Sequence, residues 1–129
     1  MAVLTGEHAY RKRAETILEA FSGEISRNFF PLATLLNNVA LLVKPLQIVL
    51  VGESGTPAFE ALRRAVYGVS LPARIIVSLP PGGSLPADHP AFGKDLVAGK
   101  PAAYVCHGPV CSLPVTDAET LLESLARVR

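Results

Sequence analysis

The feature that most constrains the fold is a short, unbroken apolar run at residues 46–51, "LQIVLV", which stops at Gly52. Continuous β-branched runs of this length are typical of strands buried on both faces of a parallel sheet. A helix is predicted to follow almost at once, with Pro57 in its first turn and Gly68 at its end. The next run, "ARIIVSL" at residues 73–79, then completes a strand–helix–strand unit. The sequence therefore predicts an α/β layer with the first strand in its centre.

The rest of this layer is predicted from proline, glycine and capping patterns. Residues 80–100 are rich in proline and glycine and are expected to form mostly loop, with a short helix over residues 92–97. A third strand is predicted at residues 102–106. The spacing "TDAE", which begins at Thr116, is that of a capping box and predicts a last helix that runs through Val128.

Two helices are predicted before the sheet. An apolar stripe of helical period covers residues 6–21, and Thr5 is its expected N-cap. A second helix is predicted over residues 31–43, because Pro45 disfavours helix at the residue before it. Apolar residues cover most of the circumference of this second helix, so it needs other structure on nearly all sides.

The predicted fold is therefore α/β, with an N-terminal helical hairpin followed by a small three-stranded, mainly parallel sheet with flanking helices. We expect a single domain over residues 1–129, with the hairpin at residues 1–45 and the α/β layer at residues 46–129. Only 18% of the residues are charged and the formal net charge is +1, so nucleic acid and anionic lipid are not expected partners. With no export pattern and no apolar stretch long enough for a bilayer, we expect a soluble, cytoplasmic protein.

The chain has only two cysteines, Cys106 and Cys111, in the sequence "CHGPVC". Cys106 is expected at the carboxyl end of the third strand, the edge where parallel sheets place functional groups. No lysine or arginine lies between Lys100 and Arg127, so little in the local sequence favours a thiolate. A structural zinc site needs about four ligands, and His107 with the two cysteines supplies three at most. We predict two reduced thiols without metal, and a disulfide on oxidation if the Cα atoms come within about 4.4–6.8 Å.

The turn "VGESGTP" at residues 51–57 joins the first strand to its helix, where some nucleotide-binding folds hold phosphate on backbone amides. The glycine spacing of a dinucleotide fingerprint and the lysine of a P-loop are both absent, and Glu53 would repel a phosphate. An ordinary turn, with Thr56 as the helix cap, is therefore the leading interpretation. A nucleotide or sugar-phosphate site at Gly52 is the alternative.

Three spaced motifs form a pattern: "LTGEHAYRKRAE", the strand "IVLVG" preceded by two prolines, and "GKPAAYVCHGPVCSLPVTD". The matching positions are Thr5, Gly6, Glu7, Tyr10, Arg11, Ala14, Pro31, Pro45, Gly52, Gly99, Lys100, Pro101, Ala103, Tyr104, Cys106, Cys111, Pro114 and Asp117. Together they resemble the C-terminal end of the spermatogenesis-associated, thioredoxin-like protein family. Its members join a thioredoxin-like domain to a helical toroid like those of six-hairpin glycosidases, followed by a small α/β segment. The resemblance implies that residues 1–45 are a remnant of the toroid, and that the thioredoxin-like active site and the toroid cavity lie outside this sequence.

The sequence and the resemblance together predict a non-catalytic accessory module, without a cofactor, that would complete and brace the toroid. The alternative from another class is a dithiol, Cys106 and Cys111, that assists redox chemistry with a thioredoxin-like partner. Because the helix at residues 31–43 is so widely apolar, we also expect a twofold homodimer through the hairpin.

Overall fold

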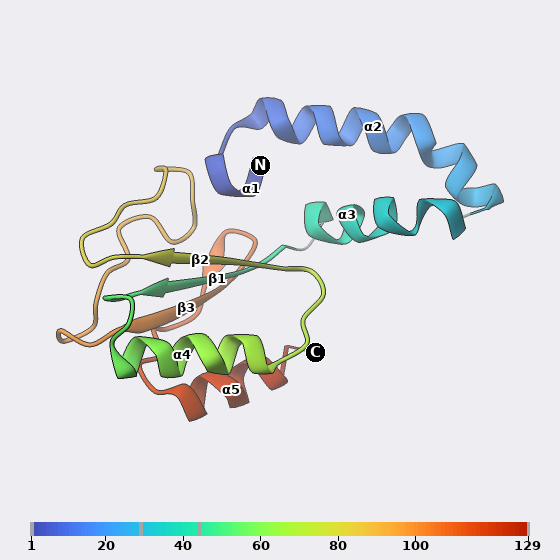
Figure 1. The fold of residues 1–129 in the computed structure, drawn as a ribbon. Helices are drawn as coiled ribbons and strands as arrows, with labels where there is room; N and C mark the ends of the chain where they lie inside the picture. Colours follow the sequence, from blue (N-terminus) through green and yellow to red (C-terminus); the bar gives the residue numbers. More distant parts are fainter. Residues whose placement is uncertain (1, 29, 44, 129) are drawn as a thin grey trace.

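The computed structural model of the protein describes residues 2–28, 30–43 and 45–128. These residues form one four-stranded sheet with the strand order β2-β1-β3-β4 (Figure 1). The strands are β1 (Leu46–Val51), β2 (Arg74–Leu79), β3 (Ala102–His107) and β4 (Val110–Cys111). The predictions of an α/β fold and of an inner position for the first strand are confirmed.

The prediction of three mainly parallel strands is wrong. β1 and β2 are parallel, but β3 runs antiparallel to β1, and β4 runs antiparallel to β3. The reason lies in the connection between β2 and β3, which forms no helix at residues 92–97 but a turn, an irregular stretch and an isolated bridge between Val97 and Lys100. The chain stays at the end of the sheet where β1 and β2 both finish, and Ala102 enters the sheet opposite Val51, the last residue of β1. A parallel third strand would need a crossover to the other edge, which is usually supplied by a helix.

One face of the sheet is covered by α4 (Pro57–Gly68) and α5 (Ala118–Ala126), which lie side by side below it in Figure 1. α4 begins and ends at the predicted residues. The alternation of side chains along each strand separates the residues that meet these helices from those on the other face. The buried side chains of this core are Leu46, Ile48, Leu50, Phe59, Leu62, Val66, Leu71, Ala103, Val105, Leu121 and Leu125.

The opposite face of the sheet is covered in part by the long connection between β2 and β3. Leu85, Leu96 and Val97 of this connection pack against a second buried cluster. That cluster consists of Val49, Val51, Ala91, Ala102, Tyr104 and Cys106. The Tyr104 hydroxyl donates a hydrogen bond of 2.6 Å to the Asp95 carbonyl, which attaches the connection to β3. Loop and strand together therefore form a second, smaller core.

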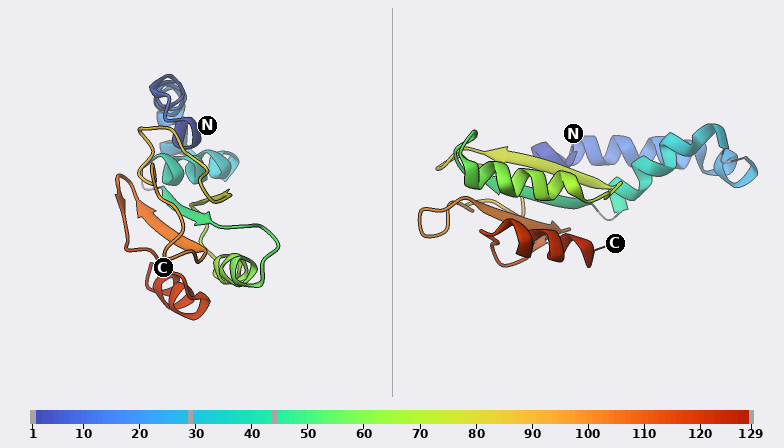
Figure 2. Two further views of the ribbon diagram at one scale, coloured as in Figure 1. Left: turned by 90° about the vertical axis from the view of Figure 1, so that its left-hand side faces the viewer. Right: turned by 60° about the horizontal axis from the view of Figure 1, so that its bottom comes forward.

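The N-terminal region is a helical hairpin that lies on the side of the sheet away from α4 and α5 (Figure 1). Its helices are α1 (Ala2–Thr5), α2 (His8–Arg27), the short 3-10 helix η1 (Phe30–Leu32) and α3 (Ala33–Val43). Figure 2 shows that the hairpin projects beyond the sheet. Neither α2 nor α3 has a buried residue. The predicted hairpin is therefore present, with most of its surface uncovered by the rest of the described chain.

Two helices are capped by residues other than the predicted ones. α2 begins after Glu7 rather than Thr5, and the Thr5 hydroxyl oxygen accepts a hydrogen bond of 3.3 Å from the Glu7 amide. α5 begins after Asp117 rather than Thr116, because the Asp117 carboxylate accepts from the amide of Thr120 at 2.8 Å and from its hydroxyl at 3.0 Å. Asp117 thereby satisfies an amide that the helix itself leaves unpaired.

Candidate functional site

The candidate site is built on a tight hairpin between β3 and β4. Gly108 has a φ of +56° and is followed by Pro109, the pattern of a two-residue type II′ turn. His107 pairs with Val110 on either side of this turn, and Cys106 pairs with Cys111 one step further. The Ser112 amide then donates to the Val105 carbonyl at 2.8 Å. Cys106 and Cys111 therefore form a pair without ladder hydrogen bonds, the kind in which opposed side chains are closest.

This register joins Cys106 and Cys111 in a disulfide, with their Cα atoms 3.9 Å apart. The prediction of two reduced thiols is wrong in this structure, and the Cα separation lies below the range expected for a disulfide. The sequence left a disulfide open only on oxidation, because the pairing depends on how the turn at Gly108 folds and on a fourth strand that we did not predict. Cys106 is fully buried, whereas Cys111 is half-buried on the edge strand.

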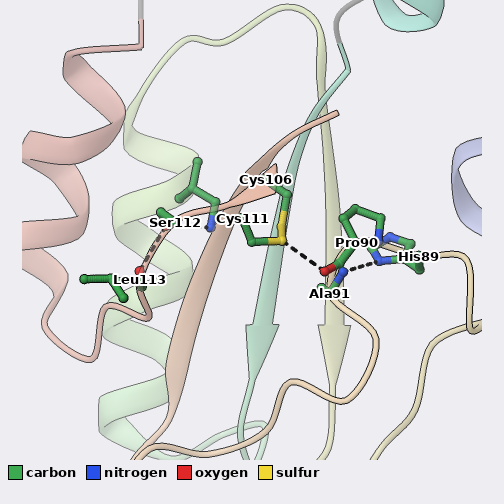
Figure 3. The surroundings of a disulfide bond; sticks show 8 residues. His89, Pro90, Ala91, Cys106, Cys111, Ser112 and Leu113 are labelled. Atoms are coloured by element: carbon green, nitrogen blue, oxygen red, sulfur yellow. Dashed lines mark hydrogen bonds between the residues drawn. A yellow bond between two sulfur atoms is a disulfide. The ribbon is translucent and has the colours of Figure 1, made fainter. Parts of the chain in front are cut away.

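The connection between β2 and β3 lies directly against this disulfide (Figure 3). The Sγ atom of Cys111 is 3.3 Å from the carbonyl oxygen of Pro90. A thiol at Cys111 has a hydrogen to donate to that oxygen, but a disulfide sulfur has none. The contact is therefore a close approach in the disulfide form and a hydrogen bond in the thiol form.

His89 lies beside this contact and is a residue that the sequence did not single out. Its side chain is only 4% exposed, and its Nδ1 atom accepts a hydrogen bond of 3.1 Å from the Ala91 amide. The neutral ring then carries its hydrogen on Nε2, which has no hydrogen-bond partner among the described residues. Burial lowers the pKa of His89 below its usual value of 6.5.

A second buried polar group lies on the same face of the sheet. Gln47 is the one polar residue of β1 and pairs with Cys106 in the antiparallel register. Its side chain is buried, and its Oε1 atom has no partner in the described part of the chain. The sequence showed Gln47 as an interruption of an apolar run, but only the register places it beside the cysteine. The disulfide therefore lies on a sheet face that combines apolar side chains with the buried amide of Gln47. The loop in contact with it adds the buried imidazole of His89.

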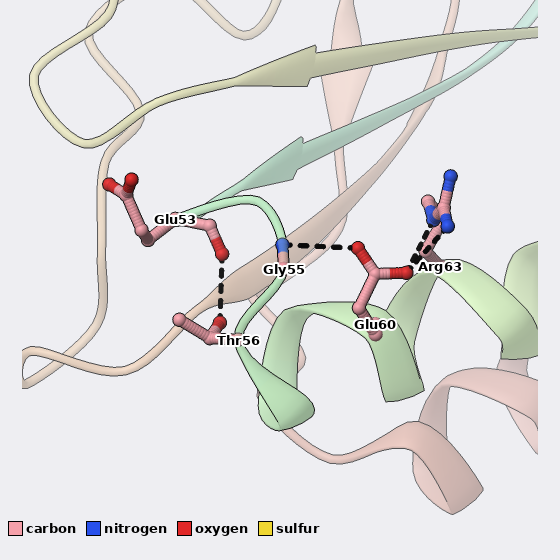
Figure 4. A network of polar contacts seen from close by, with 5 residues as sticks. All are labelled: Glu53, Gly55, Thr56, Glu60 and Arg63. Carbon is pink, nitrogen blue, oxygen red and sulfur yellow. Dashed lines mark hydrogen bonds and ion pairs between the residues drawn. The ribbon is translucent and has the colours of Figure 1, made fainter.

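Several donors of the turn after β1 form hydrogen bonds within the chain itself (Figure 4). The Gly55 amide donates to the Glu60 carboxylate at 3.2 Å, and the Thr56 hydroxyl donates to the Glu53 carbonyl at 2.8 Å. Thr56 occupies the N-cap position, as predicted, but makes no side-chain cap hydrogen bond. Although burial acts in the opposite direction, hydrogen bonds from Arg63 and Gly55 hold the pKa of Glu60 below its usual 4.5. The Glu60 carboxylate thus already occupies one backbone amide that a phosphate could have used, which favours an ordinary turn.

The glycine that begins this turn has a packing reason to be glycine. A Cβ atom at Gly52 would come within 2.8 Å of the side chains of both Phe59 and Pro101. A hollow of about 350 Å³ lies beside the turn, between Glu53 and Pro81. Its lining offers no basic side chain: Glu53, Thr56, Pro57, Ala58, Pro81, Leu96, Gly99 and Pro101.

The two sites that the sequence suggested, the cysteine pair and the turn at Gly52, lie at opposite ends of the strands. Because β3 is antiparallel, Cys106 pairs with Gln47 near the start of β1, whereas Gly52 follows the end of β1. Gln47 and Gly52 are five residues apart along β1, which is roughly 17 Å at the usual rise per residue of a strand. The expectation that Cys106 would share the carboxyl edge of a parallel sheet is therefore wrong. His107 is exposed, and the described residues contain no cluster of three or more His, Cys, Asp or Glu side chains that could hold a metal ion.

Comparison of the chain with protein-family models, with curated proteins and with solved structures gives no match. Among the described helices none is both long enough and apolar enough to span a membrane.

Proposed function

We propose that this chain is a non-catalytic accessory module that assembles through its helical hairpin. The observation that carries this proposal is the absence of any buried residue in α2, η1 and α3, although α3 is one of the most apolar segments of the chain. The exposed apolar side chains of the hairpin region include Leu4, Ile17, Phe21 and Val43. An exposed apolar surface of this kind is typical of a protein–protein interface.

The hairpin also forms a groove that another helix could fill. This groove has a volume of about 540 Å³ and lies between α2, α3 and the β2 residue Ile75. Ile17 and Leu18 line it from α2, and Leu41 and Leu42 line it from α3. Arg13 is the charged residue in the lining. The occupant should therefore present apolar side chains flanked by an acidic group.

A second copy of the chain meets this requirement. On α2, Arg13, Ile17 and Glu24 lie on one flank of the apolar face at helical spacing. In an antiparallel twofold pair of α2 helices centred near Leu18, Arg13 of one copy meets Glu24 of the other. The resemblance to toroid proteins implies that toroid helices would cover this face in a full-length relative. In this chain, the second copy takes their place.

The test is a charge-reversal experiment on the full chain, followed by sedimentation equilibrium. Arg13→Glu should weaken the dimer by at least about tenfold, because it places two carboxylates together at the interface. The double variant Arg13→Glu, Glu24→Arg should restore the dimer. Lys12→Glu is the matched control, since it changes the net charge equally but lies on another face of α2, and it should leave association unchanged.

Two results would contradict the proposal. The first is a strictly monomeric mass for the original chain at tens of micromolar. The second is equal weakening by the Arg13 and Lys12 variants, which would show that net charge, and not the proposed contact, controls association.

A further inference from the structure

We propose that the Cys106–Cys111 disulfide is a thiol–disulfide exchange site whose substrate is a dithiol, and that the incoming thiolate attacks Cys111. This inference does not depend on the hairpin, which takes no part in the disulfide. It rests on the unequal exposure of the two sulfur-bearing residues, on the position of Cys111 at the sheet edge, and on the Pro90 carbonyl beside its sulfur.

The two cysteines differ in how easily a nucleophile reaches them. Cys106 is fully buried on β3, between β1 and β4. Cys111 is half-buried on β4, which is only two residues long and forms the outer edge of the sheet. Exchange requires the attacking thiolate to approach the sulfur directly, so access decides which sulfur is attacked. Cys111 is therefore the more accessible of the two cysteines, and Cys106 is protected.

The reaction balances with a dithiol as the only co-reactant. One thiolate of the dithiol bonds to Cys111 Sγ, and the electron pair of the broken S–S bond goes to Cys106, which takes up a proton. The second thiolate of the dithiol then attacks the dithiol's own sulfur in the mixed disulfide and releases Cys111, which also takes up a proton. The chain gains two electrons and two protons, and the dithiol becomes a disulfide.

The structure accommodates the reduced form of the hairpin as well as the oxidised form. On reduction, the Cys111 thiol can donate to the Pro90 carbonyl oxygen, which lies 3.3 Å from its sulfur. The strand past Cys111 keeps other attachments, because Val115 and Ala103 exchange backbone hydrogen bonds of 2.8 and 2.9 Å. The disulfide also closes a short loop, with a sequence separation of 5, and short loops gain the least stability from closure. Reduction should therefore leave the fold in place.

The first experiment measures reduction of the folded full chain by dithiothreitol, with free thiols counted by alkylation and mass spectrometry. The expected rate rises in proportion to the dithiothreitol concentration, and the circular dichroism spectrum stays unchanged. A rate that is independent of dithiothreitol and equal to the separately measured unfolding rate would overturn the proposal. It would show that the disulfide opens only when the protein unfolds.

The second experiment compares two matched single variants, Cys106→Ser and Cys111→Ser, in reaction with dithiobis(nitrobenzoate). Cys111 in the first variant should react at least about tenfold faster than Cys106 in the second, because Cys111 is partly exposed and Cys106 is fully buried. Equal rates in two folded variants would contradict the proposed order of attack. The Arg13→Glu variant should keep the original exchange rate, so a failure of the dimer proposal is distinguishable from a failure of this one.

Discussion

Every residue of β1 is buried, whereas no residue of α3 is buried, although both segments consist mainly of Leu, Val and other apolar residues. β1 lies inside the sheet, with α4 and α5 against one face and the β2–β3 connection against part of the other. α3 has α2 beside it and little else from the described chain (Figure 2). Both segments are apolar enough to need burial, but the described residues bury only β1, in the α/β layer. In the hairpin, that unmet need is the physical basis of the proposed dimer.

The largest expected effect in this comparison comes from matched isoleucines. Ile48 of β1 is fully buried and Ile17 of α2 is 47% exposed. Ile48→Ala should lower the free energy of unfolding by about 2–5 kcal/mol, because it removes buried methyl groups and leaves a cavity. Ile17→Ala should lower it by less than about 1 kcal/mol at concentrations where the chain is monomeric. Urea denaturation measures both, and similar losses for the two variants would show that α2 is buried in the monomer.

A smaller effect is expected from the histidines of the two regions. The pKa of buried His89 is lowered, so as the pH falls below about 6.5 the unfolded chain takes up a proton before the folded chain does. The free energy of unfolding should therefore decrease with falling pH, until the folded-state pKa of His89 is passed. His89→Gln should remove this part of the pH dependence. His8→Gln, in the exposed start of α2, should leave it unchanged, and an unaltered pH profile for His89→Gln would refute this explanation.

The smallest expected effect concerns the helix caps of the two regions. Asp117 caps α5 with a side-chain hydrogen bond, whereas Glu7 precedes α2 without one. Asp117→Ala should lower the Tm by a few degrees, and Asp117→Asn, which keeps an acceptor oxygen, should lower it less. Glu7→Ala should not change the Tm measurably. Thermal unfolding followed by circular dichroism gives all three values, and equal shifts for the Asp117 and Glu7 alanine variants would be inconsistent with the capping geometry.

Part of the fold follows from local patterns. The strand at residues 46–51 and the helix that runs from Pro57 to Gly68 were predicted at their observed bounds, because an apolar run and its Pro and Gly boundaries act on the nearest turns of the chain. The α2 helix was predicted too short, since its apolar stripe weakens after Phe21. The helix nevertheless continues to Arg27, and in its last turns the hydroxyl of Ser22 donates to the Glu19 carbonyl at 2.8 Å.

The candidate site was predicted only as a pair of residues. The sequence singled out Cys106 and Cys111 but indicated thiols, because it gave no sign of β4 or of the contact with Pro90. His89 carried no signal in a loop rich in proline and glycine. Its importance comes from burial, which depends on how that loop packs on the sheet.

The sequence by itself determined which segments are helix and which are strand in most of the chain, and that one helix surface is too apolar to remain in water. The tertiary structure decided the direction of β3, the pairing of the two cysteines and the separation of the two suspected sites. The physical reason is that helix and strand preferences arise from side chains a few residues apart. The direction of β3 instead depends on the end of β1 at which the 22-residue connection from β2 re-enters the sheet. The pairing of the two cysteines depends on the register that follows from this direction.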